Sequence, residues 1–121
     1  MERWYLATLL ALILHQIDAA FWHEWDMFSV PGGIQGFLVF NLAAVGALLR
    51  GYRQVALAKP SARAYARLCG LVGAGTAAIH VAFAIAGSEE FHLPLSIAVL
   101  AACLIAGAGL LLSSRKPATG Q

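Results

Sequence analysis

Apolar residues fill four long stretches of the chain, and polar residues gather in the connections between them. The stretches cover about residues 4–24, 34–50, 65–87 and 94–113. A helix needs about 17 to 25 mainly apolar residues to cross a bilayer. The pattern therefore predicts an all-α fold, an integral membrane four-helix bundle that occupies residues 1–121 as a single transmembrane domain.

The connections differ in character. The segment SVPGG, residues 29–33, has the proline and glycines of a turn. The longest connection, residues 50–66, is expected to hold a short interfacial helix, a break at Pro60 and Ser61 as the N-cap of the third span. Residues 114–121 are expected to form a disordered tail.

Composition and charge agree with a membrane protein and give it an orientation. The chain is 60% hydrophobic and 12% charged, whereas soluble domains are about half apolar and about a quarter charged. Its basic residues occur at the N-terminus, in the second connection and at the C-terminus: Arg3, Arg50, Arg53, Lys59, Arg63, Arg67, Arg115 and Lys116. The positive-inside rule then places both termini in the cytoplasm, and juxtamembrane basic residues give no support to nucleic-acid binding.

A layer of polar residues interrupts three of the four predicted spans. Counting the helical rise from the outer ends puts His15, Asn41 and His80 about 10 Å below the outer surface. Ionisable groups are costly in lipid, which makes such a layer a candidate functional site. The candidate catalytic residues are His15, Asp18, His80 and Glu24. The candidate substrate-contacting or rim residues are Trp22, His23, Trp25, Asn41, Glu90, His92 and Ser96.

The residue types in this layer favour metal chemistry. His15, Asp18 and His80 offer two imidazoles and one carboxylate, a ligand set for Zn or Fe with an open position. A haem between the two histidines fits less well because Asp18 is so close. Without a metal, the same groups can act as acid and base toward a lipophilic substrate, or Asp18 can fix the tautomer of His15.

A motif in the first span adds a resemblance. HxxDAxxxHEW is formed by His15, Asp18, Ala19, His23, Glu24 and Trp25, and GFLVF follows at residues 36–40. This pattern resembles a family of small bacterial four-helix membrane proteins of unknown function. The resemblance implies a bacterial inner membrane location and makes His15, Asp18, His23 and Glu24 defining positions. It implies no activity, and the chain departs from it in having Asp26 after the HEW triplet and no histidine in the second span.

Three functions are compatible with these features. The first is a metal-binding membrane enzyme, metal-dependent or acid/base, that acts on a lipophilic small molecule. The second is a proton- or cation-coupled carrier or small transporter subunit in which the same residues titrate. The third is an accessory structural subunit without catalysis. Besides membrane lipid, a second copy of the chain is an expected partner, because four short spans enclose little volume and their Gly/Ala-rich faces permit close contact.

Overall fold

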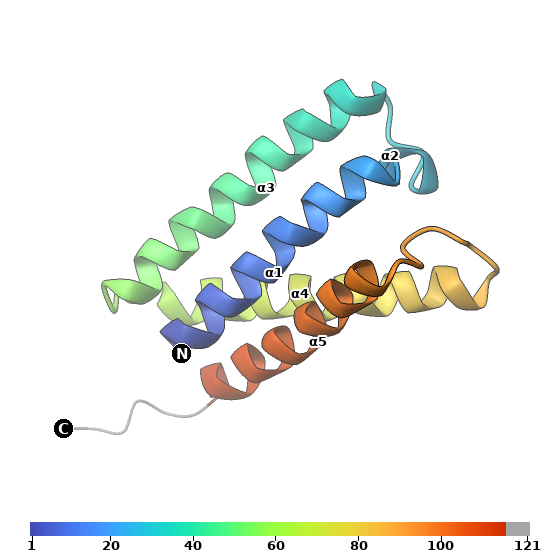
Figure 1. Cartoon of the computed structure of the whole chain (residues 1–121). Helices are drawn as coiled ribbons and strands as arrows, with labels where there is room; N and C mark the ends of the chain where they lie inside the picture. The colour runs from blue at the N-terminus through green and yellow to red at the C-terminus, as the bar shows by residue number, and fades with distance from the viewer. Residues whose placement is uncertain (116–121) are drawn as a thin grey trace.

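Over residues 1–115, which the computed structural model describes, the chain forms four long helices and one short helix (Figure 1). These are α1 (Glu2–Phe21), α2 (Glu24–Met27), α3 (Gly33–Ala56), α4 (Ala62–Ile85) and α5 (Pro94–Arg115). The four long helices are each long and apolar enough to cross a membrane. The predicted all-α four-helix membrane bundle is therefore confirmed.

The outer surface of the bundle is apolar, as contact with lipid requires. Large hydrophobic side chains are exposed on all four long helices, with Leu42, Ile85 and Leu95 each at least 80% exposed. In a soluble protein an exposed apolar surface of this extent would be an association site. Here it is the lipid-facing surface of a membrane protein.

The second connection is shorter than the sequence suggested. Helix α3 continues to Ala56 and α4 begins at Ala62, so only residues 57–61 separate them, and the expected interfacial helix is instead the last part of α3. This extension contacts α1, where the Tyr52 hydroxyl donates a hydrogen bond of 3.2 Å to a Glu2 carboxylate oxygen. Just before it on α3, the Leu48 carbonyl accepts a hydrogen bond of 2.8 Å from the Tyr5 hydroxyl. Ser61 lies at the N-cap of α4, but its hydroxyl donates to Gln54 Oε1 and accepts no hydrogen bond from the backbone N–H groups of the helix.

The fourth span also ends later than predicted. Helix α5 runs to Arg115, so the first two residues of the expected disordered tail are helical. The rest of that tail, residues 116–121, lies outside the described residues.

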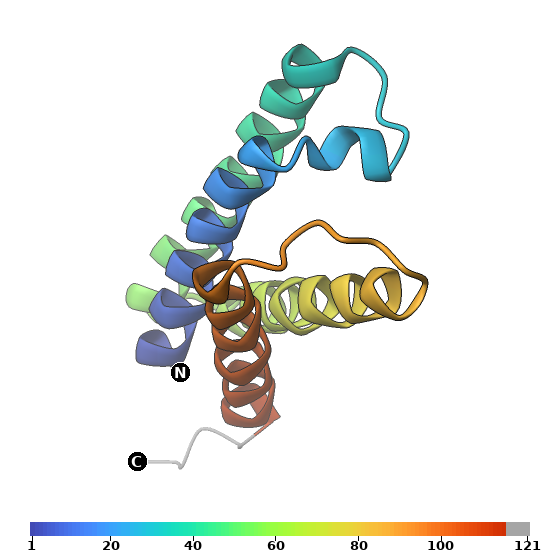
Figure 2. The same cartoon turned by 45° about the vertical axis from the view of Figure 1, so that its right-hand side comes forward.

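The helices diverge toward the end that carries α2. Helices α1 and α3 lie side by side, and α4 leans away from both (Figures 1 and 2). At the opposite end lie the N-terminus, the connection between α3 and α4, and the C-terminal end of α5 (Figure 1). The short helix α2 lies at the wide end, where it can place side chains between α1 and α4.

Glycines hold α4 against α5. A Cβ added to Gly107 would lie 2.7 Å from the Ala74 amide nitrogen and 2.9 Å from the Gly70 carbonyl oxygen. Small residues let helix backbones approach closely in membranes, where apolar burial does not drive helix association. Glycines that the sequence offered for contact between copies are thus used within the chain.

A pair of Gly→Ala substitutions in the bundle tests this close approach. Gly107→Ala is expected to destabilise the fold by about 1–3 kcal/mol, because a methyl group there meets backbone atoms that cannot rotate away. Gly75→Ala is the matched control: its added Cβ has no neighbour within 4 Å, and helix propensity favours alanine by about 0.5–1 kcal/mol. Thermal unfolding in detergent measures both, and equal melting temperatures for the two variants would contradict the predicted contact.

Candidate metal site

Three ionisable side chains from three helices converge at the wide end of the bundle. His15 comes from α1, Glu24 from α2 and His80 from α4. One Glu24 carboxylate oxygen lies 3.6 Å from His15 Nε2, and the other lies 3.3 Å from His80 Nε2. Each residue offers one possible ligand atom within 4.8 Å of the other two. Both histidines are buried, and the Glu24 side chain is only 12% exposed.

The backbone at the end of α1 explains why Glu24 points inward. His23 has a left-handed conformation with φ of 52°, which ends α1 and reverses the chain into α2. The rings of His23 and Trp25 stack at a centroid distance of 4.8 Å, and Trp25 packs at 5.4 Å from Phe37 of α3. Left-handed conformations are uncommon in residues with a side chain. This turn carries Glu24 from the predicted rim into the space between the two histidines.

Phe91 supports the histidines from the connection between α4 and α5. Its ring centroid lies 4.3 Å from that of His80 and 5.4 Å from that of His15. It is 4% exposed and has a left-handed φ of 63°. No sequence pattern pointed to Phe91, because a phenylalanine between two spans carries no ligand chemistry.

The distances among the three side chains suit a metal ion. Two ligands about 2.0–2.1 Å from a tetrahedral zinc are about 3.3 Å apart, close to the two separations between Glu24 and the histidines. Among residues 1–115, the buried Glu24 Oε2 and His15 Nδ1 have no hydrogen-bond partner. Buried polar atoms are normally satisfied. The unpaired Glu24 Oε2 lies 3.6 Å from His15 Nε2, and a cation bound between these groups would satisfy it.

The charge of Glu24 also favours a cation. Burial by itself would raise the pKa of this carboxyl, but the contacts with His15 and His80 outweigh it and lower the pKa to about 2. Glu24 is thus a carboxylate at neutral pH. Ionised carboxylates and neutral imidazoles are ligands for Zn and for Fe(II).

Asp18, the carboxylate that the sequence favoured as third ligand, lies outside this group. Its Oδ1 accepts a hydrogen bond of 3.1 Å from Trp22 Nε1, which also lies 3.4 Å from Ser96 Oγ. Its Oδ2 is buried and has no partner within the described chain. The structure brings Glu24, and not Asp18, together with the two histidines.

Asn41 joins a different contact. Gln16 Nε2 donates a hydrogen bond of 2.9 Å to Asn41 Oδ1, and Asn41 Nδ2 donates one of 2.9 Å to the Phe37 carbonyl. This link ties α1 to α3 beside the candidate site. Gln16 was not predicted as a site residue because the prediction selected the ionisable residues around it.

The remaining rim residues lie around a second, separate hollow of about 420 Å³. It is lined by Phe21, Trp22, His23, Glu89, Glu90 and His92. His92 is exposed, and its Nδ1 lies 2.6 Å from the Glu89 carbonyl. Of the predicted rim residues, Trp22, His23, Glu90 and His92 line this hollow, and none of them joins His15, Glu24 and His80. That they form the mouth of the site stays a prediction.

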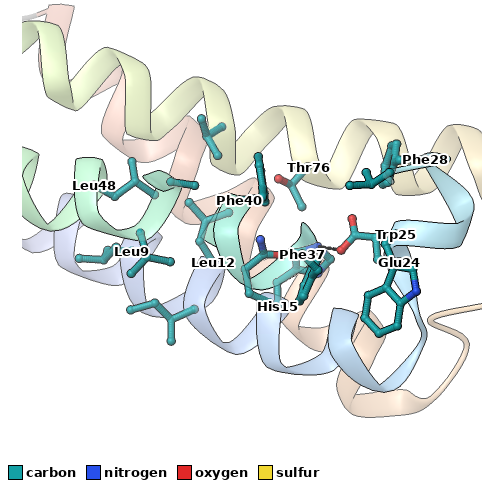
Figure 3. Close-up of a pocket in the computed structure, with 16 residues that line it drawn as sticks. Leu9, Leu12, His15, Glu24, Trp25, Phe28, Phe37, Phe40, Leu48 and Thr76 are labelled. Atoms are coloured by element: carbon teal, nitrogen blue, oxygen red, sulfur yellow. Dashed lines mark ion pairs between the residues drawn. The ribbon is translucent and has the colours of Figure 1, made fainter. Parts of the chain in front are cut away.

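An apolar cavity of about 340 Å³ is lined by two of the three side chains, His15 and Glu24. Figure 3 shows His15 and Glu24 toward one side of it and Leu9 and Leu48 toward the other. Its wall is formed by α1, α3 and α4, and by Trp25, Phe28 and Val30 in and after α2. A polar site at one end of an apolar cavity is the usual form of a small-molecule site.

Comparison with known proteins supplies a family and no activity. No curated protein and no solved structure matches the chain. The sequence pattern of a family of unknown function, DUF6713, matches residues 1–117. The resemblance to an uncharacterised family is therefore confirmed, and the chain belongs to DUF6713, a family of unknown function.

Proposed function

We propose that the chain is a multi-pass inner-membrane protein that binds Zn or Fe through His15, Glu24 and His80 and acts on a lipophilic small molecule. One observation carries the proposal: three potential metal ligands converge, and two of them, His15 and Glu24, line an apolar cavity. Three protein ligands leave an open position, which is the arrangement of catalytic rather than structural zinc. A metal held by His15, Glu24 and His80 would supply Lewis-acid chemistry toward a substrate oxygen or a water.

The position of Glu24 argues against haem. Its carboxylate contacts both imidazoles and so occupies the space that a haem plane between them would need. The cavity wall argues against a proton or cation relay. Apart from Gln16 and Thr76, the described wall beyond His15 and Glu24 is apolar, and its far end is lined by Leu9, Leu12 and Leu48, which offer no group that could pass on a charge. Binding of a lipophilic molecule is the use that this wall supports.

The distribution of charge supports an outward-facing site. The basic residues flank the end of the bundle that holds the N-terminus and the connection between α3 and α4 (Figure 1). Glu24, Asp26, Glu89 and Glu90 belong to the other end. By the positive-inside rule both termini are cytoplasmic. The metal site then lies in the outer half of the membrane.

Asp18 fits a positioning role beside this site. It is three residues from His15 on α1, and both the Asp18 Oδ2 and the His15 Nδ1 are buried without a partner in the described chain. Metal-binding histidines usually donate their other N–H to a carboxylate or a carbonyl, which fixes the ring. Asp18 Oδ2 and His15 Nδ1 are not hydrogen-bonded to each other in the described chain, so this role requires a shift of one of the two side chains when the metal binds.

Metal content tests the proposal directly. We expect the purified full-length protein to hold about one equivalent of Zn or Fe. We expect chelation to lower its melting temperature, since a metal at 100 times its Kd adds about 2.7 kcal/mol to folding. His80→Ala should lose the metal, whereas His92→Ala, which removes an exposed histidine outside the group, should keep it. Elemental analysis that finds no stoichiometric metal, with a melting temperature insensitive to chelator, would refute the proposal.

Two isosteric substitutions distinguish the proposed role of Glu24 as a metal ligand from that of Asp18 as a supporting residue. Glu24→Gln removes a direct ligand, and we expect stoichiometric metal to be lost. Asp18→Asn removes only support for His15, and we expect affinity to fall about 10- to 100-fold, as is typical for outer partners of metal ligands. Competition with a chromophoric chelator measures both affinities. If Asp18→Asn abolishes binding while Glu24→Gln leaves it intact, the ligand set is His15, Asp18 and His80 instead.

A further inference from the structure

The cavity beside the metal site is long, and its chemistry changes along its length. Its lining on α3 extends from Phe37 to Leu48, which at the helical rise is about 16 Å. The ionisable lining residues, His15 and Glu24, come from the end near α2. The far end is closed by Leu9 and Leu48, so a ligand that fills the cavity needs one polar end and one apolar tail.

One edge of the cavity faces lipid. Phe40 of α3 and Val72 of α4 line the cavity and are 56% and 38% exposed, and Phe28 near α2 is 42% exposed. On the α1 wall, by contrast, Leu9 and Leu12 are buried. Since exposed surface of the spanning helices contacts lipid, the cavity opens sideways into the bilayer between α3 and α4.

We propose that this site takes a single-chain lipid with an anionic oxygen headgroup, of the chemical class of a long-chain carboxylate. The molecule enters from the bilayer between α3 and α4. Its headgroup lies at His15, Glu24 and His80, and its chain follows α3 toward Leu48. This inference rests on the proposed metal site.

The volume of the cavity and the charge of the metal site favour this class of ligand. A volume of about 340 Å³ is at the lower end of the roughly 300–1,000 Å³ of small-molecule sites, which suits one chain and not the two chains of a phospholipid. A divalent ion held by one carboxylate and two neutral imidazoles keeps a net positive charge. Its open position therefore attracts an oxyanion.

The headgroup also has to supply the selectivity. A chain that moves from lipid into an apolar cavity gains little hydrophobic free energy, because lipid tails are as apolar as leucine. The cavity therefore selects one lipid among many through contacts at its polar end.

Photocrosslinking of the metal-loaded, full-length protein in phosphatidylcholine nanodiscs tests the inference. The probe is palmitic acid with a diazirine in mid-chain. We expect it to label α1 around Leu9 and Leu12, buried residues that bulk lipid does not reach. Two controls carry the same chain, as the methyl ester and within phosphatidylcholine, and each should label these residues at least about tenfold less. Equal labelling by either control would overturn the proposal.

Substitutions of two neighbouring residues test the path of the lipid chain in the cavity. Ala44 lines the cavity, whereas Ala43 is exposed and does not line it. Ala44→Phe should abolish α1 labelling while the metal stays bound, and Ala43→Phe should leave both unchanged. Metal content reports that each variant is folded at the site. Undiminished α1 labelling in Ala44→Phe, with the metal retained, would show that the lipid chain does not follow α3 past Ala44.

The outcomes distinguish this inference from the proposed function. Metal bound without α1 labelling means that the ligand class is wrong while the metal site stands. Failure to bind metal overturns both. Labelling that persists in Glu24→Gln after the metal is lost refutes recognition of the headgroup by the metal site.

Discussion

The contact of one carboxylate with two histidines accounts for the unusual features at the wide end of the bundle. Glu24 is a nearly buried anion in an apolar protein, and a buried charge is tolerated only when partners compensate its loss of hydration. His15 and His80 are those partners. The left-handed turn at His23 and the left-handed Phe91 are both strained positions, and strain of this kind persists where surrounding contacts hold it. The turn at His23 directs the Glu24 carboxylate inward, and Phe91 packs against the two imidazoles.

The cavity lies where α4 leaves the other helices. Glycines bring α4 against α5 where the two helices cross, whereas α3 is linked to α1 through Tyr5 with Leu48 and through Gln16 with Asn41. Toward α2, α4 leans away from both α1 and α3 (Figures 1 and 2). Space is left where α1, α3 and α4 would otherwise meet, and no large side chain fills it.

The spans could be predicted because a bilayer imposes one length and one polarity on every helix that crosses it. The common depth of His15 and His80 followed from the helical rise alone. The identity of the third ligand did not follow from the helical rise. Asp18 shares a helix face with His15, which made it the natural choice, but its Oδ1 accepts from Trp22. Glu24 arrives through the backbone conformation of His23, which residue type does not specify. Phe91 and Gln16 likewise depend on tertiary contacts that no local pattern encodes.

The side chains that can hold a metal and one long wall of the cavity belong to different helices. The three side chains that can hold a metal come from α1, α2 and α4, and none comes from α3. Helix α3 instead supplies one long wall of the cavity and, through Phe40, the edge that faces lipid. Substitutions on α3 can therefore alter the length and width of the cavity without moving an imidazole or carboxylate. Under the proposed function, substitutions on α3 would change which lipophilic molecule fits while His15, Glu24 and His80 stay in place.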